Sequence, residues 1–262
     1  MKNETLKSKR ENAMYTTSLI LHGNNKLKDY DDTENGVMYR YAQFNTRALL
    51  DCPFKSKGCT AVCYATKGNH QFPDVKASRE KAYNVSLRDD FPMMIDYTIR
   101  TEKQSGRYKN AVMLIRIHES GDFYSLKYLK KWVRIWDSTA DVDGLQFVFY
   151  TKSFQFFIRL SSEEKDVIWE QMKRGRLSIN LSIDDTTTPE QMTAYLDMMA
   201  TFPKANTYRC TENTATTEHD NVCDCADCAK CGICNTPTGK KTVVKIHSAS
   251  KADMEVYREN SK

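Results

Sequence analysis

The sequence predicts an α/β fold in which parallel strands alternate with covering helices, as either an open barrel of six units or a doubly wound sheet. Strand-like and helix-like segments alternate about six times along the chain. In addition, Ala111–His118 (AVMLIRIH) is an almost continuous apolar run, which is typical of a strand buried on both faces. The length of 262 residues suits one domain with an insertion.

Composition divides the chain into four parts. Residues 1–36 are polar and are expected to form a loosely held lead-in. Residues 37–210 are expected to form the strand–helix core, with a cysteine loop at 51–65. Residues 211–239 contain few core-sized side chains, so metal rather than apolar burial would have to order this cysteine-rich insertion. Residues 240–262 are expected to hold the last strand and the C-terminal tail.

The elements follow in order from local patterns. Helices are expected where apolar residues recur at i, i+3, i+4 and i+7, as they do from Leu129 to Trp136. Pro92 is expected to break one long helical segment in two, and the Thr188–Pro189 pair is a good helix start. The expected strands lie at 39–50, 111–118, 145–150, 177–183, 205–210 and 241–246. The expected helices lie at 74–101, 125–138, 153–173 and 189–200.

Nine cysteines indicate a metalloprotein, and the lack of a signal-peptide or membrane-spanning pattern in the sequence predicts that it is located in the cytoplasm. No run of about eighteen apolar residues is present, so no membrane partner is expected. The first apolar stretch is too short for a signal peptide, which predicts a cytoplasmic location with reduced thiols. The odd number of cysteines, in two tight groups, does not suit a disulfide scaffold and favours metal binding.

The C-terminal group of cysteines carries the stronger signal. Five thiols lie between Cys223 and Cys234, four of them at two-residue gaps. Repeated Cys–x–x–Cys turns point pairs of sulfurs at one centre, as in cubane iron–sulfur clusters or tetrahedral zinc sites. Iron–sulfur is favoured, because zinc sites usually place a long spacer between two such pairs. The candidate ligands of this group are Cys210, Cys223, Cys225, Cys228, Cys231 and Cys234.

The first group consists of Cys52, Cys59 and Cys63, separated by six and three residues. Three protein thiolates on a four-iron cluster leave one iron open to a substrate or cofactor. Three cysteines in a loop therefore suggest chemistry, whereas four suggest structure or electron transfer. The alternatives are two structural cysteines with a bystander, or a zinc site completed by a remote histidine.

Polar side chains also follow the other expected strands. If the fold is a barrel of parallel strands, these side chains and both cysteine groups lie at the carboxyl edge, where such folds place active sites. The alternative for the run His118–Asp122 is a turn before a helix capped by Ser125, and Lys152 either holds an anion or is solvated. The strand-end residues are His118, Glu119, Asp122, Lys152, Asn180, Ser182, Asp184 and His247.

Several segments resemble motifs of the phage gene product eighty-eight family. The likeness runs from about Tyr39 to Cys234. The family's name conveys no chemistry, but a phage setting suggests a nucleotide or nucleic acid as substrate or partner. The segments are Cys52–Pro53, Cys59–Ala65, Arg116–Ser125 with Trp132 downstream, Tyr150–Ser153 and the Cys–x–x–Cys–Gly–Ile–Cys ending.

The arrangement also resembles radical S-adenosylmethionine (SAM) enzymes, in which a three-cysteine loop follows the first strand of a partial (β/α)6 barrel. The cysteine gaps here are wider than those usual in that superfamily. The resemblance implies a 4Fe–4S cluster on Cys52, Cys59 and Cys63, SAM on its open iron, and an external electron donor. It also implies an auxiliary cluster in the C-terminal insertion. By this resemblance, catalytic roles would fall to Glu119, Asp122 and Lys152, and cofactor binding to Tyr64, His118, Asn180, Ser182 and Asp184.

Three functions stay open from the sequence, and an enzyme resembling radical SAM proteins is the favoured one. A zinc-stabilised nucleic-acid-binding module is the second, and the net charge of +5 would tolerate it. Asp220, Asp224 and Asp227 flank the C-terminal cysteines, however, which disfavours a nucleic-acid surface there. The third is an iron–sulfur electron carrier, which would not need six strand–helix units with polar strand ends.

Overall fold

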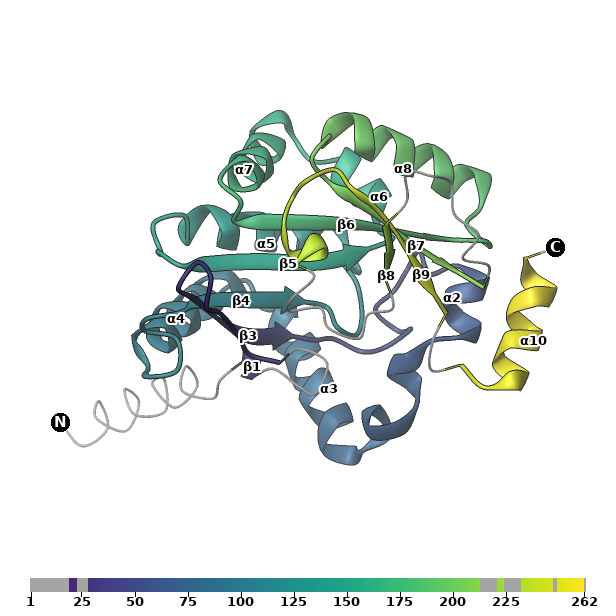
Figure 1. Cartoon of the computed structure of the whole chain (residues 1–262), viewed down its shortest axis with the longest axis horizontal. Helices are drawn as coiled ribbons and strands as arrows, with labels where there is room; N and C mark the ends of the chain where they lie inside the picture. The colour runs from purple at the N-terminus through teal and green to yellow at the C-terminus, as the bar shows by residue number, and fades with distance from the viewer. Residues whose placement is uncertain (1–18, 23–27, 213–220, 224–231, 247–248, 262) are drawn as a thin grey trace.

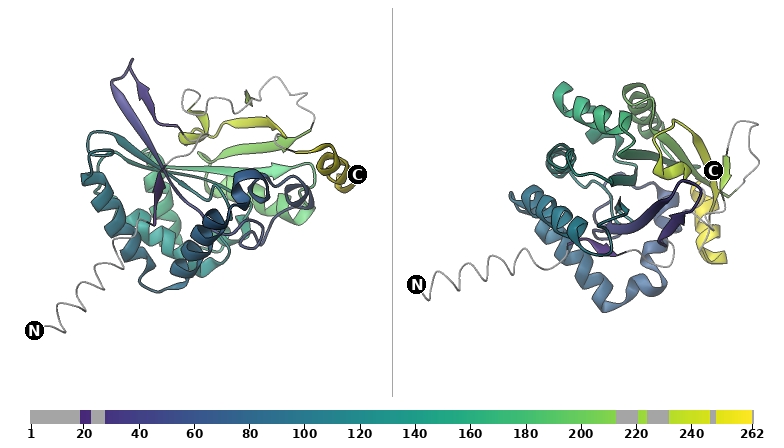
Figure 2. Two further views of the ribbon diagram at one scale, coloured as in Figure 1. Left: turned by 90° about the horizontal axis from the view of Figure 1, so that it is seen from below. Right: turned by 60° about the vertical axis from the view of Figure 1, so that its left-hand side comes forward.

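A curled sheet of parallel strands forms the centre of the protein, as the computed structural model shows (Figure 1). The structure describes residues 19–22, 28–212, 221–223, 232–246 and 249–261. Seven strands run parallel in the order β3, β4, β5, β6, β7, β9, β8 and curl into a half-barrel (Figure 2). The strands are β3 (Val37–Phe44), β4 (Val112–Ile117), β5 (Leu145–Thr151), β6 (Leu177–Asp184), β7 (Asn206–Thr211), β8 (Asn221–Cys223) and β9 (Lys241–Lys245).

Helices cover one face of the sheet, and an aromatic core lies between the two layers (Figure 2). The pattern predicted around Trp132 is confirmed, since Leu129, Trp132 and Trp136 are all fully buried. The Ser125 hydroxyl caps this helix by accepting from the backbone N–H of Tyr128. The helices of this layer are α4 (Phe91–Gln104), α5 (Leu126–Ser138), α6 (Phe154–Ile158), α7 (Ser162–Lys173) and α8 (Pro189–Thr201).

The two faces of the sheet differ in chemistry because side chains alternate along each strand. On β6, Leu177, Ile179 and Leu181 belong to the core beneath the helices. The intervening side chains therefore face the concave side, and they are polar. There, Ser178 Oγ and Asn180 Nδ2 donate to the carbonyl oxygen of Cys234, at 2.8 and 2.9 Å. These bonds hold the short 3-10 helix η3 (Ile233–Asn235) against the concave face.

All six predicted strands are present, and the mixed α/β architecture is confirmed. The first strand ends at Phe44 rather than Leu50, where its pairing with β4 ends at Ile117. Just beyond it, Asn45 Oδ1 accepts a hydrogen bond from the backbone N–H of Glu119 at 2.8 Å. The helix predicted at 153–173 is two helices, because Ser161 starts a new one with a capping box. The predicted break at Pro92 is confirmed by separate helices α3 (Pro73–Leu87) and α4.

Outside the strands and helices predicted from the sequence, the structure adds smaller elements. Strands β1 (Leu21–His22) and β2 (Tyr30–Asp32) pair antiparallel with β3, so part of the polar lead-in joins the sheet. Residues 213–220 and 224–231 of the predicted cysteine-rich insertion lie outside the described part of the chain. The helix η3 belongs to the same insertion and is described. Among the described residues, none of the helices has the length and apolar character needed to span a bilayer.

Candidate functional site

A cavity of about 230 Å³ lies at the carboxyl ends of the parallel strands. This is the edge at which half-barrels and barrels of parallel strands place their active sites. Six consecutive strands of the sheet, from β3 to β9, contribute side chains to its lining, either directly or through the loops that follow them. Its polar and cysteine lining consists of Cys52, Lys55, Cys59, Cys63, Tyr64, Arg116, His118, Glu119, Ser120, Asp122, Tyr150, Thr151, Lys152, Ser182, Asp184, Tyr208, Cys210 and Tyr257.

The three cysteines of the first group all line this cavity, as the sequence predicted them to lie together. They follow β3 in a loop that contains the short helix α2 (Lys57–Ala61). Burial is the largest cause that raises the pKa of each thiol, to about 11 for Cys59. The thiols also act on one another, because the charges of Cys59 and Cys63 raise the pKa of Cys52. Lys152 has the opposite effect and lowers the pKa of Cys59.

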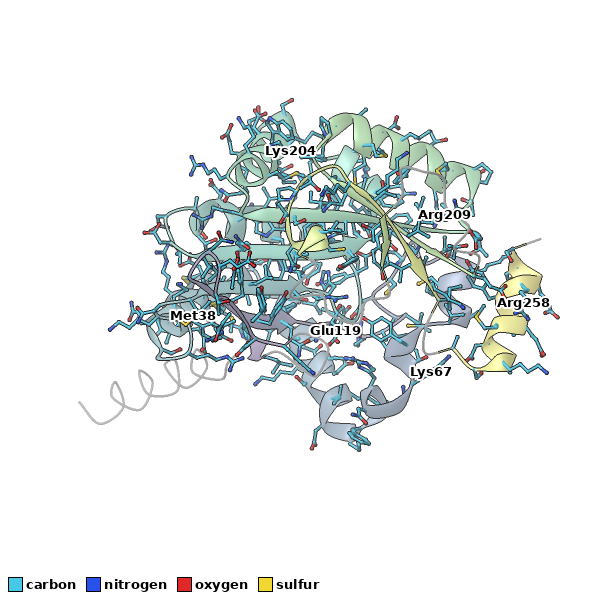
Figure 3. The ribbon with its side chains drawn as sticks, viewed as in Figure 1. Met38, Lys67, Glu119, Lys204, Arg209 and Arg258 are labelled. Carbon is cyan, nitrogen blue, oxygen red and sulfur yellow. The ribbon has the colours of Figure 1, made fainter. Side chains whose placement is uncertain are left out.

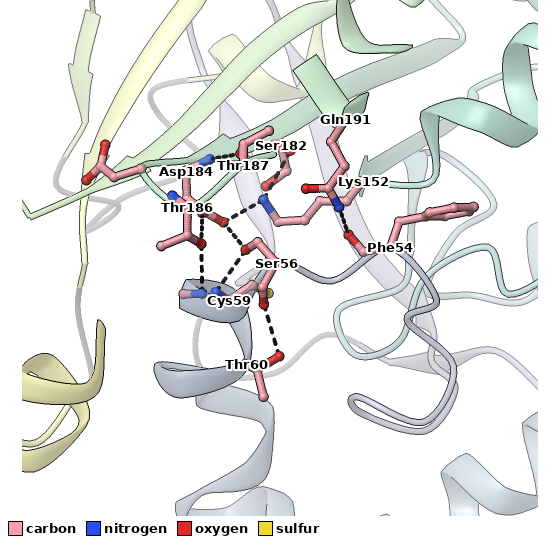
Figure 4. A network of polar contacts seen from close by, with 12 residues as sticks. Phe54, Ser56, Cys59, Thr60, Lys152, Ser182, Asp184, Thr186, Thr187 and Gln191 are labelled. Atoms are coloured by element: carbon pink, nitrogen blue, oxygen red, sulfur yellow. Dashed lines mark hydrogen bonds and ion pairs between the residues drawn. The ribbon is translucent and has the colours of Figure 1, made fainter. Parts of the chain in front are cut away.

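A buried polar network ties this cysteine loop to the end of β6 (Figure 4). Ser56 caps α2 by accepting from the backbone N–H of Cys59 at 3.0 Å, and its hydroxyl donates to the carboxylate of Asp184. The backbone N–H of Gly58 donates to Thr186 Oγ1 at 2.8 Å. The position of the cysteine loop is therefore set by residues about 130 positions later in the chain.

Asp184 is fully engaged by its neighbours. Lys152 Nζ lies 2.8 Å from its Oδ2, and the backbone and hydroxyl of Thr186 donate to its Oδ1 at 2.9 and 2.7 Å. Burial raises the pKa of Asp184, but the charge of Lys152 and the hydrogen bonds outweigh it, so the net shift is downward. Asp184 is thus a carboxylate that positions Lys152 and the cysteine loop at the cavity.

The C-terminal helix α10 (Lys251–Asn260) packs against α2 and supports the cysteine loop from outside. A Cβ atom on Gly58 would lie 2.5 Å from Cε2 of Tyr257, so only glycine allows this approach. The hydroxyl of Tyr257 donates to Asp185 Oδ2 at 3.1 Å. Lys67, which follows the loop, forms an ion pair with Asp253 of α10 at 2.5 Å (Figure 3).

Residues 118–123, which follow β4, lie between the cavity and the core: residues 118–122 line the cavity, and Phe123 belongs to the core. His118 has a left-handed φ of +62°, a conformation in which non-glycine residues are uncommon. Its imidazole packs against Phe123 and shares a hydrogen bond of 2.8 Å with the hydroxyl of Tyr128. Burial lowers the pKa of His118 to about 3, so the ring is neutral. The ring of His118 is therefore engaged in the core beneath the helices, although the residue borders the cavity.

Asp122 joins the loops after β4 and β5. Thr151 Oγ1 and the backbone N–H of Lys152 donate to its two carboxylate oxygens, at 2.7 and 2.9 Å. Burial raises the pKa of Asp122 to about 6, against the opposing effect of these hydrogen bonds. Glu119 is also buried at the cavity, and its carbonyl oxygen accepts from the hydroxyl of Tyr64 (Figure 3). Of the predicted catalytic residues, all three border the cavity.

The remaining predicted residues divide into three groups. Ser182 and Cys210 line the cavity. Asn180 does not line it, because its amide is bound to the carbonyls of Phe149 and Cys234 below the cavity. Cys234 lies on the concave face outside the cavity lining, and burial and then the nearby Cys234 thiol raise the pKa of Tyr150. Four further predicted residues lie outside the described part of the chain: Cys225, Cys228, Cys231 and His247. The backbone of Cys223 is described as part of β8, but its side chain is not.

Within the described part of the chain, no three His, Cys, Asp or Glu side chains are close enough together to bind a single metal ion. The three loop thiols thus share a cavity without forming a compact mononuclear site. Sequence reasoning missed Arg116, Tyr150 and Tyr208 as cavity residues. A charged residue inside the apolar run of β4 was the signal that could have found Arg116, since a buried strand rarely carries a charge.

The fold and the cavity together define an α/β half-barrel protein with a cysteine-lined site at the carboxyl ends of its strands. The chain belongs to the family Gene product 88, which matches residues 17–237. It is also 30% identical over 121 residues to the Gene 88 protein of Mycobacterium phage L5. That match covers 45% of this chain and 49% of the relative, so the chain spans about half the relative's length. No solved structure matches the chain.

The predicted likeness to the phage family is thereby confirmed. The resemblance to radical SAM enzymes, the cofactors and the auxiliary cluster stay predictions.

Proposed function

We propose that this protein is an iron–sulfur enzyme resembling radical SAM proteins, with a 4Fe–4S cluster held by Cys52, Cys59 and Cys63. The observation that carries the proposal is that three thiols from one loop line a single cavity at the carboxyl ends of parallel strands. When bound and reduced, such a cluster supplies the electron for the reductive cleavage of SAM.

The three thiols are the donors that the cavity offers to a cluster. The three thiols share the cavity, yet no three candidate ligands in the described residues are close enough for one ion. A cubane binds its cysteines at separate corners, one thiolate to each iron. Burial raises the thiol pKa values, so the thiolates need a cationic partner to form in this cavity.

The surrounding residues have roles that follow from their contacts. Lys152 lowers the pKa of Cys59 and thus favours its thiolate, and Asp184 holds Lys152 in place. Asp122 positions the backbone of Lys152. Glu119 and Ser182 border the cavity and are the residues proposed to contact the amino acid and ribose parts of SAM.

Metal and acid-labile sulfide analysis of anaerobically purified protein tests the proposal. Wild type should be brown and contain about four iron and four sulfide for the first cluster, with more if the C-terminal cysteines bind a second. The Cys52→Ala/Cys59→Ala/Cys63→Ala variant should lose one cluster. Cys234→Ala removes a half-buried thiol that lies outside the cavity lining and is a candidate ligand of the second centre, so this variant should retain the first cluster even if the second is lost. Colourless wild-type protein that contains zinc would refute the proposal.

A further inference from the structure

We propose that the inner part of the cavity binds the anionic group of the substrate, a carboxylate or a phosphate, and that Arg116 is the residue that holds it. This inference rests on the proposed function, because it assigns the substrate class of the same cavity. It is carried by a charged side chain that faces the cavity without a charged partner.

Arg116 lies on β4 between Ile115 and Ile117, which are both fully buried in the core under the helices. By alternation, its side chain projects to the concave face, where it lines the cavity. Its Nε is buried and has no hydrogen-bond partner. Among the described residues, none accepts a hydrogen bond from its guanidinium group, and no carboxylate lies within ion-pair distance of 4.0 Å.

Other buried cations of the protein are satisfied by the protein itself. Lys131 Nζ donates to three backbone carbonyls, at 2.6 to 2.9 Å. The two terminal nitrogens of Arg176 donate to three carbonyls, although its Nε, like that of Arg116, has no partner. Lys152 pairs with Asp184. Arg116 is half-buried, and no hydrogen-bond acceptor or carboxylate in the described part of the chain contacts its guanidinium group, so this group is available to a ligand in the cavity. Burial lowers the pKa of Arg116, but Tyr64, Tyr150 and Glu119 raise it, so the net shift is upward and the group keeps its charge in the cavity.

The neighbours of Arg116 indicate the body of the ligand. Its Cζ lies 4.7 Å from the ring centroid of Tyr150, and the ring of Tyr208 packs edge-on against Tyr150 at 4.9 Å. Both tyrosines line the cavity. A guanidinium fork binds carboxylate and phosphate in a bidentate manner, and aromatic walls suit a flat or apolar group. The substrate class is therefore an organic anion with a planar or apolar body.

Binding of small probes to the full-length protein tests this inference. Benzoate and phenyl phosphate provide the two anionic groups on one aromatic body, and benzamide is the neutral analogue of benzoate. Each is titrated calorimetrically into wild type, Arg116→Gln and the matched control Arg209→Gln. Arg209 lies on β7 and is exposed, so its loss changes the net charge equally without touching the cavity lining (Figure 3).

At least one of the two anions should bind wild type and Arg209→Gln at least tenfold more tightly than Arg116→Gln, and benzamide should bind all three weakly. If benzoate binds more tightly than phenyl phosphate, the anionic group is a carboxylate, and if phenyl phosphate binds more tightly, it is a phosphate. The ligand-free Arg116→Gln protein should melt at the same temperature as wild type or higher, since it loses an unpaired charge. A lower melting temperature would assign Arg116 a structural role. Equal binding to Arg116→Gln, or no binding of either anion to wild type, overturns the inference.

Iron and sulfide content of the same preparations separates the two proposals. Anion binding that depends on Arg116 in a protein without iron would sustain the inference and refute the iron–sulfur proposal. If the protein contains iron and sulfide but binds the anions equally well with and without Arg116, the iron–sulfur proposal stands and the inference about Arg116 is refuted.

Discussion

Replacing Asp184 with asparagine tests whether the end of β6 holds the cysteine loop and Lys152. The side chains of Lys152 and Asp184 are only 11% and 3% exposed, and their charged atoms lie 2.8 Å apart. Asparagine would leave the ammonium without a counter-charge and turn an N–H2 group toward donors such as Ser56 or Thr186. Breaking a buried pair on one side costs about 3–5 kcal/mol, a large part of the roughly 5–15 kcal/mol that stabilises a typical domain.

Urea unfolding followed by circular dichroism measures the change in the free energy of unfolding. Asp141→Asn is the matched control, because its pair with Arg100 is exposed, at 68% and 39%, and its loss should cost less than about 1 kcal/mol. Adding Lys152→Met to Asp184→Asn should recover part of the loss, since the double variant buries no unpaired charge. An Asp184→Asn variant as stable as Asp141→Asn would refute the role assigned to this network.

Two further substitutions test the support from α10. Gly58→Ala should destabilise the protein by about 1–3 kcal/mol, because its Cβ would lie 2.5 Å from the ring of Tyr257 and overpacking outweighs the roughly 1 kcal/mol helix gain of alanine. Gly106→Ala, with nothing within 4 Å, is the control, and equal unfolding curves for the two variants would contradict the packing argument. The pKa of Asp253 is lowered from 3.8 to about 2, chiefly by its hydrogen bond from Lys67, so its contribution to stability is complete above pH 3.8 and is lost as the pH falls toward 2. The melting temperatures of wild type and Asp253→Asn should therefore differ at pH 5 and converge near pH 2, whereas a constant difference would show that ionisation of Asp253 is not involved.

The strands were predictable from the sequence because their signal is local. The run 111–118 and the alternating pattern of 177–183 both indicate strands without knowledge of their neighbours. The small elements were not predictable in the same way. Strands β1 and β2 are short, and they exist through pairing with β3 rather than through their own pattern.

The candidate site was predictable in its membership but not in the roles of its residues. Residues that follow parallel strands meet at one edge, so the sequence could place Cys52, Glu119 and Lys152 together. It could not show that Asp184 holds the cysteine loop, because that contact joins residues 128 positions apart. Nor could it show that His118 turns its ring toward the core, which follows from its left-handed backbone.

The most direct test of the proposed function is product analysis after reduction of the anaerobically purified protein with dithionite in the presence of SAM. Wild type should release methionine and 5′-deoxyadenosine, with one electron from dithionite and one hydrogen atom from substrate or solvent for each SAM cleaved. The Cys52→Ala/Cys59→Ala/Cys63→Ala variant, and wild type without dithionite, should release neither. Iron-loaded wild type that leaves SAM intact, or equal cleavage by the triple variant, would contradict the assignment of these three cysteines to a SAM-cleaving cluster.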